Sequence, residues 1–106
     1  MASPVVRRIT LFKLPEAADV DAALAKYATL KDDAKKGAQP YILAASASRV
    51  YDDPRCQGFT ICAETSFASL DDMKYYDDEC AAHGAIKALI KPKLQGPPLI
   101  IYMDEK

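Results

Sequence analysis

The hydrophobic residues of the N-terminal stretch 5–14, VVRRITLFKL, predict a β-strand that is covered on both faces. Successive side chains of a strand point to opposite faces, so Ile9 and Leu11 share one face while Thr10 and Phe12 share the other. A strand with one solvent-exposed face alternates apolar and polar residues, but this stretch carries apolar residues on both faces. We therefore expect the protein's own helices to cover one face and a second copy of the chain to cover the other.

Three later stretches have apolar residues at the three- and four-residue spacing that predicts helices. The first runs from about 20 to 34 with Asp19 as its N-cap, the second begins after the capping residue Ser69, and the third spans about 81–91. The buried stripe predicted for the third helix consists of Ala82, Ile86, Leu89 and Ile90. The acidic run 77–79, between the last two helices, is expected to be a solvated loop.

Three further extended stretches, 41–50, 58–67 and 99–104, are predicted to be strands. The order of elements is then β-α-β-β-α-β with the second helical region split in two, which is the arrangement of an α+β ferredoxin-like fold with one antiparallel sheet. Two such sheets placed face to face make a dimeric α/β barrel. We expect a single domain over residues 1–106, with its core at about 5–104.

Composition and charge exclude several classes of partner. A chain of 106 residues with a formal charge of −1 and a pI near 5.7 has no basic field for a phosphate backbone, so no nucleic acid partner is expected. No apolar run approaches the ~20 residues of a membrane span, and the N-terminus lacks the features of a signal peptide. We therefore expect a cytoplasmic protein with no membrane partner.

The cysteines do not predict a metal site. Cys56, Cys62 and Cys80 have no paired spacing, and the chain offers a single histidine, His83, to join them. We expect no metal and no cofactor. Reduced thiols are the favoured interpretation, and a reactive thiol at Cys56 or Cys80 is the lesser alternative.

Several stretches, taken in order, resemble the stress-response dimeric A/B barrel (Dabb) family: RITLFKL, QGFT, ETSFASLDDMKYY and AAHGAIKALIKP, followed by a closing apolar strand. The PAH motif of that family lacks its proline here but keeps its histidine, His83. The resemblance implies a homodimer with a mostly apolar cavity between the sheet and the helices of each subunit. Members include stress-induced proteins of unknown chemistry, polyketide cyclases of the olivetolic acid cyclase type and a plant hydroxynitrile lyase.

The same resemblance implies candidate site residues. In the cyclase a tyrosine and a histidine of the second helical region carry the chemistry, and these positions are Tyr76 and His83 here, while Tyr27 matches a tyrosine of the first helix. Arg8 stands where both enzymes have a histidine at the start of the first strand. This departure makes a lyase mechanism that relies on the first-strand histidine harder to support. Ile61 stands where the cyclase has a histidine on its third strand.

The chemistry of these side chains leaves alternatives open. His83, with an ordinary pKa of roughly 6.5, can take a proton from carbon next to a carbonyl, or it can simply bond a backbone carbonyl. Tyr76 can orient His83 or donate to an oxyanion, or it can be a core aromatic residue. Arg8 can clamp a carboxylate or enolate at the cavity mouth, or it can reach solvent or pair with an acid.

The residues expected to line the ligand cavity come from the first and third strands and from the first two helices, although such residues are usually plain core. They are Arg8, Thr10, Phe12, Leu24, Tyr27, Ile61, Ala63 and Met73. The favoured function is a homodimer with a cavity for a small apolar or aromatic molecule, acting as a cofactor-free polyketide cyclase-like enzyme. The alternatives are a noncatalytic stress-induced or ligand-binding dimer and a cofactor-free monooxygenase of the related barrels.

Overall fold

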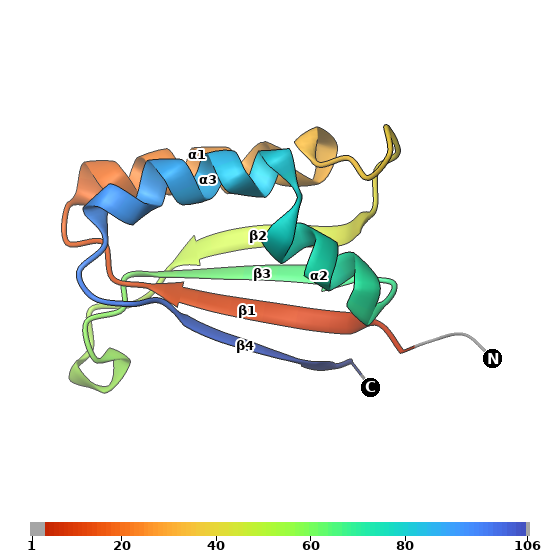
Figure 1. Ribbon diagram of the computed structural model, residues 1–106. Coiled ribbons are helices and arrows are strands. Elements are labelled where there is room, and N and C mark those ends of the chain that lie inside the picture. Colours follow the sequence, from red (N-terminus) through yellow and green to blue (C-terminus); the bar gives the residue numbers. More distant parts are fainter. Residues whose placement is uncertain (1–3, 106) are drawn as a thin grey trace.

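Four antiparallel strands form one sheet in the order β2-β3-β1-β4, and the helices lie on one of its faces (Figure 1). This computed structural model describes residues 4–105. Its elements are β1 (Val6–Phe12), α1 (Ala17–Asp33), β2 (Ile42–Arg49), β3 (Ile61–Phe67), α2 (Leu70–Asp78), α3 (Ala81–Ile90) and β4 (Leu99–Asp104), with short 3₁₀ turns at Pro54–Cys56 and Lys91–Lys93. The predicted ferredoxin-like β-α-β-β-α-β fold is confirmed.

The central strand β1 has the two-sided character that its sequence predicts. Arg8, Thr10 and Phe12 are buried beneath the helices, while Ile9 and Leu11 point to the outer face and are only half-buried. Since β1 pairs with β3 on one side and β4 on the other, its backbone hydrogen-bonding groups are satisfied within the sheet. The strand therefore holds the inner row of side chains at fixed spacing under the helices.

Helix α1 covers the β2 edge of the sheet, at the other side of the sheet from β4. Its apolar stripe of Val20, Ala23, Tyr27 and Leu30 is buried, and α1 packs against β2, whose small Ala45 and Ala47 are half-buried. Small side chains at these two positions let the helix approach the sheet closely, which explains their presence despite the modest strand propensity of alanine.

The helix boundaries correct the predicted start of α1 and confirm the predicted start of α2. Helix α1 begins at Ala17 with Glu16 as its N-cap, so Asp19 lies in the first turn, where a carboxylate favours the positive end of the helix dipole. The cap of α2 is as predicted, because the Ser69 side chain accepts a hydrogen bond from the backbone N–H of Asp72 at 3.1 Å.

The inner stripe of α3 also differs from the prediction. Leu89 is 37% exposed, and the buried positions are His83, Ile86 and Ile90. These residues are spaced by three and four, so they lie on one face of the helix, and a histidine takes the first place in a row that is otherwise apolar.

The outer face of the sheet carries apolar side chains that no described element covers. All six residues of β4 are exposed, and no helix of residues 4–105 lies on this side (Figure 1). Within the same range, no helix is long and apolar enough to cross a membrane.

Candidate functional site

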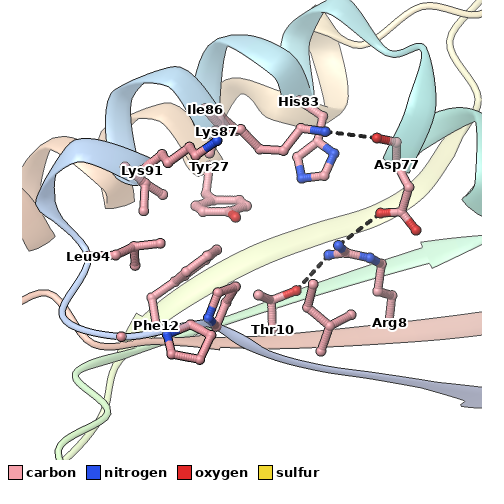
Figure 2. Close-up of a pocket in the computed structure, with 15 residues that line it drawn as sticks. Arg8, Thr10, Phe12, Tyr27, Asp77, His83, Ile86, Lys87, Lys91 and Leu94 are labelled. Carbon is pink, nitrogen blue, oxygen red and sulfur yellow. Dashed lines mark hydrogen bonds and ion pairs between the residues drawn. The ribbon is translucent and has the colours of Figure 1, made fainter.

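A cavity of about 660 Å³ lies between α3 and the β1–β4 half of the sheet (Figure 2). Its volume falls within the ~300–1,000 Å³ range of small-molecule sites. The apolar wall consists of Phe12, Ile86, Ile90, Leu94, Pro97, Pro98 and Ile100. The polar and ionisable lining residues are Arg8, Thr10, Tyr27, Asp77, His83, Lys87 and Lys91. Arg8, Asp77 and His83 lie toward one end of the cavity (Figure 2).

Two periodic rows of side chains face each other across this cavity. The α3 row is His83, Ile86 and Ile90, and the β1 row is Arg8, Thr10 and Phe12. The space between them opens because β4 is the edge strand and its residues are exposed on both faces. The cavity is thus the space between α3 and the β4 side of the sheet that no side chain of the helices fills.

His83 lies on the cavity wall with one ring nitrogen engaged and one available. Its side chain is 3% exposed, and Nδ1 lies 2.8 Å from the backbone carbonyl oxygen of Tyr76. Because a carbonyl oxygen only accepts, Nδ1 carries the hydrogen and donates it, which leaves the lone pair on Nε2. Figure 2 shows the ring projecting from α3 into the cavity.

The charge state of His83 follows from its surroundings. The pKa of His83 is lowered to about 4, chiefly by burial; the hydrogen bond to the Tyr76 carbonyl opposes this, and the positive charges of Arg8 and Lys87 add to the lowering. The imidazole is therefore neutral at neutral pH. A neutral ring with a free Nε2 lone pair can accept a proton from a bound molecule.

Tyr76 supports His83 through its ring and backbone, and its hydroxyl does not line the cavity. The two rings are stacked with centroids 3.7 Å apart and planes 8° from parallel. Within residues 4–105 the Tyr76 hydroxyl is buried without a hydrogen-bond partner, and burial raises its pKa. The predicted orientation of His83 by Tyr76 is thus made by the Tyr76 carbonyl, not by its hydroxyl.

Arg8 forms the floor of the polar end of the cavity. Its Nη1 donates to Thr10 Oγ1 at 2.6 Å, its Nη2 pairs with Asp77 Oδ1 at 2.9 Å, and its guanidinium carbon lies 5.2 Å from the Tyr76 ring centroid. Only 4% of Arg8 is exposed, so the guanidinium does not reach bulk solvent. The prediction of a solvated acidic loop is wrong for Asp77, which belongs to the last turn of α2 and pairs with Arg8.

Tyr27 contributes a second hydroxyl to the cavity lining, besides that of Thr10. Its ring comes from α1, and Figure 2 shows its oxygen on the side of the ring that faces the sheet. Burial raises the pKa of Tyr27, and the positive charge of Arg8 opposes the rise. The hydroxyl is therefore protonated at neutral pH and can donate a hydrogen bond into the cavity.

The structure divides the residues predicted to form the site. Those on the cavity wall are Arg8, Thr10, Phe12, Tyr27 and His83. Those placed elsewhere are Leu24, which packs against the core, and Ile61, Ala63, Met73 and Tyr76, which belong to it. The strand order explains part of this difference, because β3 lies on the opposite side of β1 from β4, so Ile61 and Ala63 lie away from the cavity.

Sequence reasoning did not identify several wall residues. Ile86 and Ile90 lie three and seven residues after His83, so helical spacing places them on the same wall once His83 points inward. Lys87 and Lys91 lie four and eight residues after His83 and border the same wall. Ile100 and the turn at 96–98 carried no signal, because the β1–β4 register that puts Ile100 opposite Thr10 is a tertiary feature. Residues 4–105 contain no cluster of three metal-ligating side chains.

The chain is similar in sequence to a protein from a fungal biosynthesis cluster. A protein of Gibberella zeae described as a fusaristatin A biosynthesis cluster protein is 41% identical over 85 residues. That alignment covers 80% of this chain but 62% of the relative, so the chain spans less than two thirds of the relative's length.

Two solved structures share the fold at low sequence identity. The hydroxynitrile lyase of Passiflora edulis has a TM-score of 0.77 and 16% identity, covering 97% of this chain and 94% of that one. A dimeric ferredoxin-like protein of unknown function from Thermobifida fusca has the same TM-score and identity, covering 97% and 92%. Residues 6–104 match the family described as the stress responsive A/B barrel domain, and the chain therefore belongs to that family, as its sequence predicted.

Proposed function

We propose that this chain forms a homodimer through the outer face of its sheet, and that the cavity on the inner face binds a small apolar or aromatic carbonyl compound and acts on it as a cofactor-free cyclase. The observation that carries the proposal is the neutral His83 imidazole, with Nε2 unbonded among the described residues, in the wall of a 660 Å³ cavity. Fold likeness to a hydroxynitrile lyase does not by itself select the reaction.

The dimer is supported by an apolar patch on the outer face. By the register of β1 with β4, this patch consists of Ile9, Leu11, Leu99, Ile101 and Met103. The three β4 members are 40–45% exposed in the single chain. Contiguous exposed apolar side chains of this kind mark association surfaces, and the Thermobifida fusca protein of the same fold is dimeric.

Replacing Ile101 with aspartate is expected to separate the dimer into single chains. The substitution changes little in a lone subunit, where Ile101 is 45% exposed, but it would bury a charge between two sheets. Light scattering should give twice the chain mass of 11.6 kDa for the wild type and the chain mass itself for the variant. Tyr51→Asp is the matched control, because Tyr51 is 90% exposed in a loop, and it should stay dimeric. A monomeric wild type at micromolar concentration would contradict the proposed dimer.

The proposed chemistry starts with proton transfer to His83. Nε2 removes a proton from a carbon between two carbonyl groups, and the enolate forms next to the Arg8 guanidinium and the Tyr27 hydroxyl, which stabilise its negative oxygen. The enolate carbon then bonds to a third, more distant carbonyl carbon of the same molecule, whose oxygen becomes an alkoxide and takes a proton back from the imidazolium. Tyr76 is a positioning residue here, holding His83 through its carbonyl and its ring face.

Incubation of the purified wild-type protein with linear polyketide acids tests the catalytic part of the proposal. We expect ring-closed products to form faster than in buffer, as measured by mass spectrometry, since the cavity brings the reacting carbons together. Ligand binding by calorimetry without any acceleration would favour the noncatalytic ligand-binding dimer instead. Neither binding nor acceleration with any of these acids would overturn the proposal for this class of compound.

A further inference from the structure

We propose that the cavity selects ligands that carry a carboxylate, held by Lys87 and Lys91, with the apolar body of the ligand against the hydrocarbon side chains of the same cavity. The inference deepens the proposed function and depends on its ligand-binding part, not on its catalytic part. It assigns the anionic end of the ligand to two residues for which sequence reasoning had predicted no role.

The first support is the charge of the cavity lining. Lys87 on α3 and Lys91 directly after it are four positions apart, so both lie on the cavity wall, and both are exposed enough to meet an incoming molecule. The lining holds three basic residues, Arg8, Lys87 and Lys91, and one carboxylate, Asp77. Because Asp77 already pairs with Arg8, the two lysine charges are left without a counter-charge in the lining.

The second support is the bonding of these cations. Among residues 4–105, neither Lys87 nor Lys91 has a carboxylate within 4.0 Å, whereas Arg8 is engaged on both terminal nitrogens, by Thr10 and Asp77. Lys87 Nζ donates to the Asp77 backbone carbonyl at 2.8 Å, which holds the ammonium at the polar end of the cavity, as Figure 2 shows. An ammonium has three N–H donors, so Lys87 keeps donors for a ligand oxygen.

The third support is the electrostatic effect of the lining on its own ionisable groups. The positive charges of Arg8 and Lys87 both contribute to the lowered pKa of His83, and that of Arg8 also acts on Tyr27. Because Arg8 is paired with Asp77, the two lysines set the sign of the potential at the cavity wall. An anion entering this space is attracted, and a cation is repelled.

The apolar wall defines the rest of the ligand. Ile86, Ile90, Leu94 and Ile100 present hydrocarbon surface to the same cavity that the lysines border. A molecule that satisfies both features has an aromatic or alkyl body and one carboxylate. Arg8, which the sequence offered as a clamp for a carboxylate or an enolate, has both terminal nitrogens engaged, and only its Nε lacks a partner among the described residues. We therefore assign the carboxylate to the two lysines and leave Arg8 to the enolate oxygen.

A matched pair of ligands that differ only in charge tests this inference. We would measure the binding of para-pentylbenzoate and para-pentylbenzamide by calorimetry to the wild type, to the double variant Lys87→Gln/Lys91→Gln, and to Lys74→Gln. Lys74 is an exposed lysine of α2 that does not line the cavity, so it is the control for lost charge. The wild type should bind the benzoate roughly three- to tenfold more tightly than the benzamide, as expected for partly exposed ion pairs.

The double variant should bind both compounds with the affinity that the wild type has for the benzamide, and Lys74→Gln should keep the preference. The preference should also weaken as ionic strength rises, because salt screens exposed charges. Equal binding of the two compounds by the wild type, or a preference that survives in the double variant, would overturn the inference while leaving the ligand cavity in place. Failure of both compounds to bind would overturn the inference and the proposed ligand site together. Absence of cyclase activity alone would leave the carboxylate inference unaffected.

Discussion

The variant His83→Gln is expected to convert a substrate of the wild-type protein at least about 100-fold more slowly, because general-base catalysis typically contributes ~10²–10⁴-fold. Glutamine can still donate a hydrogen bond to the Tyr76 carbonyl, which His83 Nδ1 contacts at 2.8 Å, but it has no basic nitrogen to replace Nε2. The loss should appear in kcat with little change in KM, since the wall that binds the ligand body is unchanged. Steady-state kinetics on the linear acid with the highest wild-type turnover would measure both constants.

Tyr76→Phe is the matched control for this experiment. It keeps the stacked ring and the backbone carbonyl and removes only a buried hydroxyl that has no partner among the described residues. Turnover should therefore stay within a few-fold of the wild type. A loss as large as that of His83→Gln would assign a chemical role to the hydroxyl, and unchanged turnover in His83→Gln would remove His83 from the mechanism.

Acid is expected to destabilise the protein through the same histidine. In the unfolded chain His83 has an ordinary pKa of 6.5, and in the fold its pKa is lowered to about 4. Above pH 6.5 the ring is neutral in both states and contributes no pH dependence. As pH falls from 6.5 to 4, the unfolded state binds a proton that the folded state does not, so the free energy of unfolding decreases. The full effect, reached below pH 4, is on the order of 3 kcal/mol, since each pKa unit is worth about 1.4 kcal/mol.

Urea unfolding of the wild type and His83→Gln at pH 7.5 and pH 4 would measure this effect. Carboxylates also titrate in this range, but they are present in both proteins, so the difference between the two pH dependences isolates His83. The wild type should lose about 2 to 3 kcal/mol more than the variant over this range. Equal losses in the two proteins would show that His83 is not held neutral by the fold.

The sequence by itself determined the elements and the two-sided character of the sheet. Alternating side chains in β1, helical spacing in α1 and the Ser69 cap are local patterns, each set by the geometry of a single strand or helix. His83, the one histidine of the chain, was a candidate before any contact was known because of the family resemblance and because an imidazole can take a proton near neutral pH. The family resemblance added Tyr27 and Arg8 to the site.

Only the tertiary structure decided how these residues meet. Arg8 and Asp77 are far apart in the chain, and their ion pair depends on α2 ending above β1, which no local pattern encodes. Likewise, the cavity lies beside β4 because the strand order is β2-β3-β1-β4, so Ile61 and Ala63 on β3 pack in the core while Lys87 and Ile100 reach the wall. Periodicity states which face of an element is buried, whereas strand order and register decide what that face is buried against.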